Sequence, residues 1–211
     1  MATEELTFPK YTLGIGDRFG RQGVAQLKAL VAARAEGIEV SPVWNKSNRE
    51  HLLVGTEPSS VRAEADAAVA AVGWTHPYFV DADHIGLKTV DRFIQCCDFF
   101  TIDVADALGK PPDAAALQAL VAKHASEEPL RFPGLSCPID RTPAAVEAAA
   151  HKFLAAMIEA GQVYRHVRDV KGASFIVEVS TDEASHPQSP SELYVSFSLF
   201  HLLFETLFQH C

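Results

Sequence analysis

Two carboxylates and an imidazole follow an apolar run in the segment YFVDADHIGL, residues 78–87. The residues 78–80 predict a buried strand, and Asp83 and His84 come shortly after it. Imidazole is a common ligand of divalent metals, and a neighbouring carboxylate can act as a base or orient the ring. Asp83 and His84 are therefore candidates for metal-assisted acid–base chemistry. A strand-to-helix turn with a capping Asp and a solvated His is the alternative.

A further carboxylate, Glu178, lies inside the apolar segment ASFIVEVS, residues 173–180. A carboxylate within such a strand is rarely buried without a partner. We therefore expect Glu178 either to face a polar edge of the fold or to pair with a cation.

Two loops that follow predicted strands carry groups suited to an anionic ligand. In GIGDRFG, Gly16 would let backbone N–H groups approach an anion, and the planar guanidinium of Arg18 next to Asp17 suits a carboxylate or phosphate. In NKSNRE, Lys46 and Arg49 could contribute positive charge. A glycine turn with a surface Asp–Arg pair and a solvated loop are the respective alternatives.

These segments are set in a regular alternation of strands and helices, which predicts a parallel α/β fold. Both a doubly wound sheet and a (β/α)8 barrel fit the alternation. Polar clusters after several successive strands favour a TIM-barrel-like fold, but a complete barrel takes about 250 residues, so an incomplete barrel is expected. The predicted strands are 11–15, 38–44, 78–80, 99–104 and 173–180, and the predicted helices are 22–37, 61–73, 90–97, 114–124 and 142–160.

The C-terminal residues differ in composition from the rest of the chain. The stretch SFSLFHLLFETLFQHC, residues 196–211, is dense in Phe and Leu and almost without charge. We therefore predict a partial barrel over residues 1–195 and an apolar tail over residues 196–211, which could drive homo-oligomerisation.

Composition and charge narrow the classes of partner. The chain has 211 residues and a formal net charge of −9, and no basic patch is interleaved with aromatics, which argues against nucleic acid. The sequence contains no run of about 18 consecutive apolar residues, so no membrane span is predicted. The acidic N-terminus does not resemble a secretory signal. The four cysteines form no zinc-like spacing, so a reduced, cytoplasmic protein is expected.

Four segments taken together resemble the tagaturonate/fructuronate epimerase family of hexuronate catabolism. They are GIGDRFG, SPVWNKSNRE, FVDADHIG with FFTIDVAD, and FIVEVSTDEAS. The resemblance covers roughly residues 11–195. It implies a cytoplasmic isomerase on a TIM-barrel-like fold that depends on a divalent metal cation and interconverts two keto-hexuronates, D-tagaturonate and D-fructuronate.

The resemblance also implies roles for individual residues. Asp83 matches the proton acceptor of the family, Glu178 the proton donor, and His84 one metal ligand. Arg18, with Lys46 or Arg49, could hold the substrate carboxylate. Members of the family are considerably longer, and their other metal ligands lie in a part without a counterpart here, so we expect a truncated chain whose activity is open.

Two other functions fit the same residues. Another metal-dependent barrel enzyme, an aldolase or an isomerase acting on a sugar acid, could use the same Asp, His and Glu. A truncated product without catalytic activity is the non-enzymatic alternative.

Overall fold

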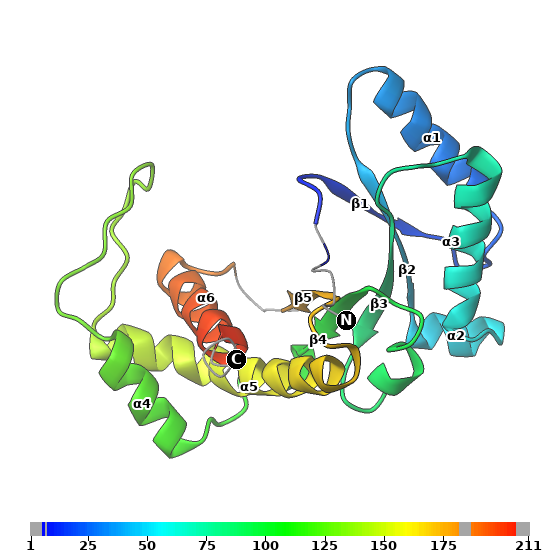
Figure 1. Cartoon of the computed structure of the whole chain (residues 1–211). Helices are drawn as coiled ribbons and strands as arrows, with labels where there is room; N and C mark the ends of the chain where they lie inside the picture. Colours follow the sequence, from blue (N-terminus) through cyan, green and yellow to red (C-terminus); the bar gives the residue numbers. More distant parts are fainter. Residues whose placement is uncertain (1–5, 7, 182–186, 206–211) are drawn as a thin grey trace. The chain divides into compact units, whose positions relative to one another are not determined.

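The computed structural model describes residues 6, 8–181 and 187–205, and in this part of the chain strands alternate with helices (Figure 1). The elements are β1 Thr12–Gly16, α1 Gly23–Ala35, β2 Ser41–Ser47, α2 Asn48–Val54, α3 Ser59–Val72, β3 Phe79–Ile85, the 3-10 helix η1 Val90–Arg92, β4 Phe99–Asp103, the 3-10 helix η2 Ala105–Ala107, α4 Ala114–His124, α5 Pro143–Lys171, β5 Ile176–Ser180 and α6 Pro190–Glu205.

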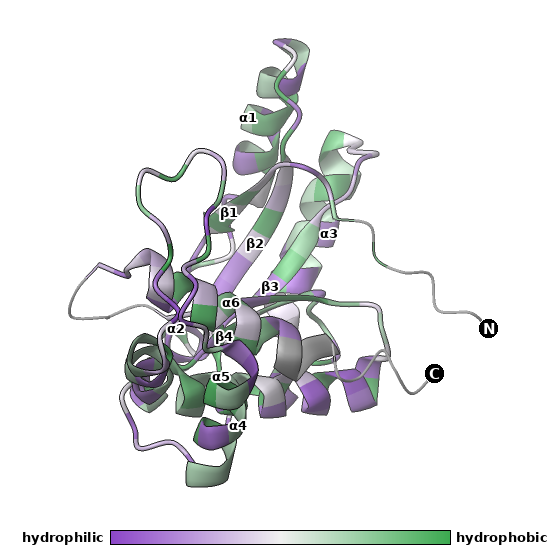
Figure 2. Cartoon of the chain, turned by 90° about the vertical axis from the view of Figure 1, so that its left-hand side faces the viewer, coloured by the Kyte–Doolittle hydropathy of each residue, from purple (hydrophilic) through white to green (hydrophobic). Residues whose placement is uncertain are grey.

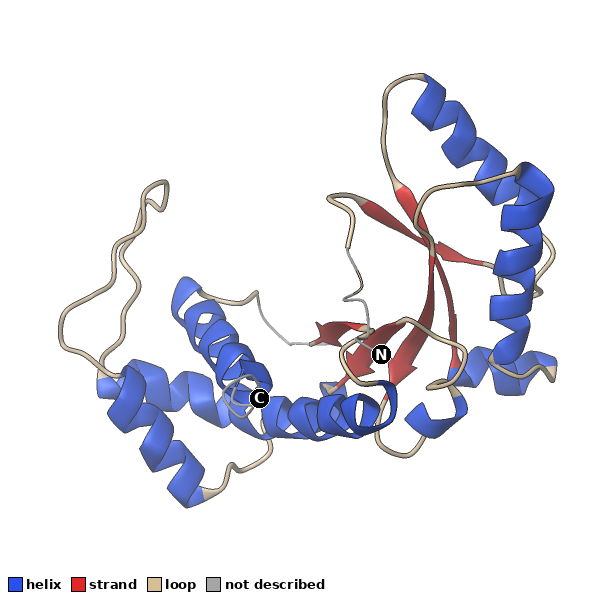
Figure 3. Cartoon of the chain, in the orientation of Figure 1, coloured by secondary structure: helices blue, strands red, loops and turns tan. Residues whose placement is uncertain are grey.

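The five strands form one sheet in the order β1-β2-β3-β4-β5 (Figure 3). The first four strands pair in parallel. The Ile176 N–H donates to the Asp98 carbonyl where β4 and β5 begin, and the Val104 N–H donates to the Ser180 carbonyl where they end, so β5 runs parallel to β4. The predicted parallel α/β fold is confirmed. The parallel direction places the carboxyl ends of all five strands along one edge.

The chain divides into two compact units. The first comprises residues 1–102 and 165–179, and the second comprises residues 103–164 and 180–211. In the first unit α1 and α3 pack on each other, and α3 also packs on β2 and β3. Figure 2 shows hydrophobic and hydrophilic residues on the same helix in α1 and α3, as expected of helices that bury one side. Leu27, Ala65 and Val80 are among the fully buried residues of this layer.

The second unit is mainly helical and contains α4, α6 and most of α5. Four residues of α5 at helical spacing, Val146, Ala150, Phe153 and Met157, are all buried. Leu120 of α4 and Leu199 of α6 are buried as well. Helix α5 begins at Pro143, near the predicted start, because Pro is favoured at the first helical position and Thr142 Oγ1 accepts the Ala145 N–H at 3.4 Å. It continues to Lys171, beyond the predicted end at residue 160.

Several predicted elements differ from the observed ones. The helix expected over residues 90–97 is only the short η1. The polar stretch expected to be a loop after residue 44 instead contains the end of β2 and the helix α2. A capping box forms there, because the Ser47 hydroxyl accepts the Glu50 N–H and Glu50 accepts the Ser47 N–H. This pattern, S-x-x-E, is visible in the sequence.

Candidate functional site

Strand β3 carries the carboxylates and the imidazole within its own length rather than in a following loop. It runs to Ile85, so Asp81 and Asp83 are strand residues two positions apart. Asp81 is only 5% exposed, whereas the Asp83 side chain is 21% exposed and that of His84 is 46% exposed. The predicted site residues Asp83 and His84 thus lie where the buried strand reaches the carboxyl edge of the sheet.

Asp83 and His84 contact each other in an irregular part of β3. The His84 Nδ1 atom lies 2.6 Å from Asp83 Oδ1. The β3–β4 register shifts between Ala82 and Ile85, and His84 has a φ of 53°, the one positive value at a non-glycine residue in the described chain. Such backbone conformations are costly and are concentrated at functional sites. A carboxylate bound to an exposed imidazole is suited to proton transfer or to orienting the ring.

Asp81 is a buried carboxylate that the sequence reasoning did not single out. Its Oδ1 accepts the Thr101 N–H at 3.1 Å, and its Oδ2 lies 3.0 Å from Thr101 Oγ1. Burial, together with the charges of Asp83 and Glu178, raises the pKa of Asp81 to about 7, although the Thr101 hydrogen bonds lower it in part. The signal in the sequence is the alternation of strand residues, which places 81 and 83 on the same face.

Glu178 lies on β5 and is exposed, as expected for a carboxylate at a polar edge. Its charge acts on Asp81 together with that of Asp83. The charges of Asp83 and Glu178 thus both act on the buried Asp81.

The glycine-rich loop after β1 is organised by Asp17. Its carboxylate accepts the backbone N–H groups of Phe19, Gly20, Arg21 and Gln22, at 2.5–3.2 Å. Partial burial raises the pKa of Asp17, but these N–H groups together hold it below its ordinary value. The Asp17 carboxylate thus shapes the loop from within.

Gly16 serves the packing of two strands. It is the register partner of Asn45 on β2, which in turn is the register partner of Asp81 on β3. A Cβ atom at Gly16 would lie 3.3 Å from Asn45 Oδ1. Gly16 therefore makes room for a polar side chain in the same row as the buried carboxylate.

The three cationic side chains predicted to bind substrate differ in their exposure to solvent. Arg18 is half-exposed, and its Nε donates to Glu50 Oε1 at 3.0 Å. Arg49 is exposed on α2. Lys46 is only 2% exposed, and its Nζ donates to Thr56 Oγ1 at 2.8 Å. Burial lowers the pKa of Lys46, while the charges of Glu50 and Asp17 raise it in part.

The buried Lys46 is part of a cluster with His51, a residue that the sequence analysis does not single out. His51 is 1% exposed, and its Nδ1 lies 3.0 Å from Thr56 Oγ1. Burial, and then the charges of Lys46 and Arg92, lower the pKa of His51 to about 4, so the ring is neutral at neutral pH. Thr56 thus links the two buried groups beside α2.

A divalent metal would need more donors than this edge brings together. Among the described residues no group of three His, Cys, Asp or Glu side chains is placed to hold a metal ion. A catalytic site of the zinc type needs about three protein ligands. The described residues of this chain therefore do not form a complete metal site by themselves.

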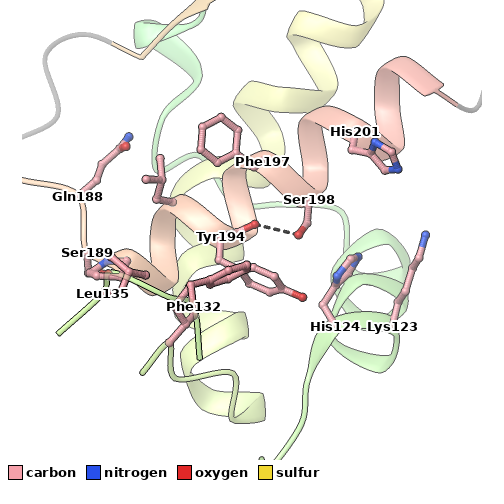
Figure 4. Close-up of a pocket in the computed structure, with 13 residues that line it drawn as sticks. Lys123, His124, Phe132, Leu135, Gln188, Ser189, Tyr194, Phe197, Ser198 and His201 are labelled. Carbon is pink, nitrogen blue, oxygen red and sulfur yellow. Dashed lines mark hydrogen bonds between the residues drawn. The ribbon is translucent and has the colours of Figure 1, made fainter. Parts of the chain in front are cut away.

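A separate cavity of about 800 Å³ lies in the second unit and contains none of the predicted site residues (Figure 4). Its walls are mostly apolar, with Phe132, Leu135, Tyr194 and Phe197 around it and His124 at its side. The cavity lacks the carboxylates that acid–base chemistry would need.

The parallel sheet and its helices define an α/β protein. The carboxylates on β3 and β5 give it a candidate acid–base site. The model of the tagaturonate epimerase (UxaE) family matches residues 2–202, and the chain belongs to this family. The match extends beyond residue 195, where we predicted a boundary to the apolar tail, and that boundary stays a prediction.

Solved structures of one protein, the fructuronate-tagaturonate epimerase UxaE from Cohnella laeviribosi, share the fold. Its complex with one glycerol matches with a TM-score of 0.75 and 20% identity over 96% of this chain and 43% of that chain. The native structure matches with a TM-score of 0.70 and the same identity and coverage. The chain thus spans less than half the length of these relatives. No curated protein matches the chain significantly.

No helix in the described ranges is both long and apolar enough to cross a membrane.

Proposed function

We propose that the chain takes part in the interconversion of D-tagaturonate and D-fructuronate, with Asp83 as proton acceptor and Glu178 as proton donor. The observation that carries the proposal is the family match over residues 2–202, which includes both carboxylates. Asp83 lies on β3 and Glu178 on β5 of the same sheet. Both charges act on Asp81, which supports a shared site.

We also propose that the sheet is one arc of a TIM-barrel-like fold. The strands are neighbours in the order of the sequence, from β1 to β5. Sequential order is the arrangement of a (β/α)8 barrel, whereas a doubly wound sheet reverses its order at a switch point. Active sites of such barrels lie at the carboxyl ends of the strands, where Asp83 is found.

The proposed chemistry inverts a carbinol carbon that is beta to the ketone, so its C–H bond is not acidified directly. In a retro-aldol route Asp83 takes the hydroxyl proton, and the electron pair left on that oxygen forms the C=O of an aldehyde. The adjacent C–C bond breaks, and its electron pair passes to the ketone to give an enediolate. The aldehyde rotates, the enediolate carbon adds to its other face, and Glu178 returns a proton to the new alkoxide. Keto migration followed by enolisation is the second route.

Among the residues predicted to bind substrate, Arg18 and Arg49 are the two with exposed side chains. We propose that they hold the substrate carboxylate, since guanidinium binds carboxylate in a bidentate manner. Gly16, Asp17 and Lys46 would act indirectly, because their observed contacts lie within the protein.

The acid–base roles predict that Asp83→Asn and Glu178→Gln each slow epimerisation by at least about 100-fold, the usual contribution of a positioned acid or base. Conversion of D-tagaturonate is followed by ¹H NMR with a divalent cation added. Glu147→Gln, an exposed carboxylate on α5, is the matched control and should keep the wild-type rate. Unchanged rates in both site variants would contradict the assigned roles.

The same reaction in D₂O separates the two routes. Keto migration with enolisation introduces deuterium at the inverted carbon, whereas retro-aldol cleavage keeps its original hydrogen. A wild-type chain that converts neither sugar acid would support the alternative that this chain is a product without catalytic activity.

We propose His84 as this chain's ligand to a divalent metal cation, which when bound would stabilise negative charge on the substrate. Since one imidazole binds weakly alone, we expect a weak site that is weaker still in His84→Ala. Binding of Mn²⁺ is measured by electron paramagnetic resonance, with the exposed His151→Ala as control. Equal affinities in the two variants would contradict the ligand role.

A cytoplasmic location and a homo-oligomer complete the proposal. Leu193 and Phe197 of α6 are exposed apolar residues, and they support self-association.

A further inference from the structure

Asp81 and Thr101 form a buried cross-strand contact directly beside the candidate site. Both residues are 5% exposed. One Asp81 oxygen accepts the Thr101 N–H at 3.1 Å, and the other lies 3.0 Å from the Thr101 hydroxyl. Both donors of Thr101 are therefore directed at the same carboxylate on the neighbouring strand.

Thr101 occupies a special place in the pairing of β3 with β4. The register pairs Ala82 with Phe100, and the next pair is Ile85 with Ile102. Asp83 and His84 on β3 are thus opposite one residue of β4, Thr101, which is the arrangement of a β-bulge. The positive φ of His84 lies in this bulge.

A carboxylate is a costly residue at such a position. A buried strand usually carries an apolar side chain, because moving a charge out of water is unfavourable. Burial and the charges of Asp83 and Glu178 raise the pKa of Asp81 to about 7, which shows that the charged form is disfavoured. A specific contact must offset this cost, and the contact observed is the one with Thr101.

We propose that Asp81 is a positioning residue, whose carboxylate holds Thr101 opposite the bulge and thereby turns Asp83 and His84 outward at the carboxyl edge of the sheet. What the two outward residues do rests on the proposed function. The positioning itself does not, and it can be measured without activity.

The test is the backbone conformation of His84 in the full chain, obtained from three-bond J couplings in ¹³C,¹⁵N-labelled protein. Asp81→Val keeps a strand-forming side chain but removes both contacts to Thr101, and we expect His84 to lose its positive φ. Asp81→Asn can accept the Thr101 N–H and donate to the hydroxyl, so it should keep the wild-type conformation. Rescue by this conservative variant would show that the contact, rather than the charge, is needed.

Asp98→Asn is the matched control. The Asp98 carboxylate also reaches across the same pair of strands, to the Val80 N–H at 3.4 Å, but at the end remote from the bulge. It should leave the His84 conformation unchanged. A folded Asp81→Val variant with the wild-type φ at His84 would overturn the proposal.

Thr101→Val keeps the proposal testable if Asp81→Val does not fold, because it removes only the hydroxyl contact. We expect a second set of His84 resonances from chains with the alternative conformation, and a single wild-type set would overturn the proposal. If the chain is active, Asp81→Val should lower kcat by about 100-fold with little change in KM, as for a misplaced catalytic group. An inactive wild-type chain would contradict the proposed function and leave the conformational result standing.

Discussion

The Asp81 carboxyl group gives the first unit a pH-dependent stability of definite sign. Burial, with the nearby charges of Asp83 and Glu178, raises its pKa to about 7, whereas an unfolded Asp titrates near 3.9. The folded chain therefore holds this proton more tightly. Its contribution to the free energy of unfolding is fully present below about pH 4 and is lost as the pH rises through about 7.

The expected loss over this range is on the order of 4 kcal/mol, from the difference between the two pKa values. Urea unfolding at about pH 4 and about pH 8, on either side of this titration range, measures most of this loss, and Asp81→Asn should remove most of the difference. The exposed Asp106→Asn should retain it. Equal pH dependence in the wild type and in Asp81→Asn would show that Asp81 does not titrate in this range.

At the scale of single residues, local sequence singles out Asp83 and Glu178 but not Asp81. Asp83 and Glu178 could be selected because each is a carboxylate in or beside an apolar run. Asp81 is not recognisable in this way, since the apolar run of residues 78–80 ends before it, whereas the strand continues to Ile85. The partner that makes its burial tolerable, Thr101, lies on another strand and cannot be read from local sequence.

At the scale of elements, helices with a continuous apolar stripe were predictable and irregular ones were not. The predicted helix over residues 114–124 coincides with α4. Residues 90–97 show the same apolar spacing, but η1 ends after one turn, and the buried side chains Phe93 and Ile94 pack from a turn instead. Tertiary burial of a short apolar segment thus prevailed over its helical period.

The bulge in β3 is likewise beyond local sequence. It depends on how β3 and β4 pair, because two residues of one strand oppose one of the other. The parallel sheet could be predicted from the alternation of strands and helices. The β3–β4 register, which determines the positions of Asp83 and His84, could not.

At the scale of the whole molecule, the two compact units share one helix. Residues 143–164 of α5 belong to the second unit and residues 165–171 to the first. A chain of two units need not unfold in a single transition. Both tryptophans, Trp44 and Trp74, are buried in the first unit, so tryptophan fluorescence reports on that unit alone. Circular dichroism at helical wavelengths also reports on the helical second unit.

We therefore expect the fluorescence and circular dichroism transitions in urea to differ. Leu27→Ala creates a cavity in the first unit and Leu199→Ala one in the second, since both side chains are fully buried. Each should cost about 2–5 kcal/mol in its own unit. Leu27→Ala should shift the fluorescence transition, and Leu199→Ala should shift only the circular dichroism transition.

The shared helix sets the outcome that would contradict this expectation. If α5 couples the units strongly, breaking the core of either unit frays the helix that the other needs. Both probes would then report one transition, and either substitution would move it by the same amount. In that case the site edge would depend on packing in the second unit, although none of the predicted site residues belongs to that unit.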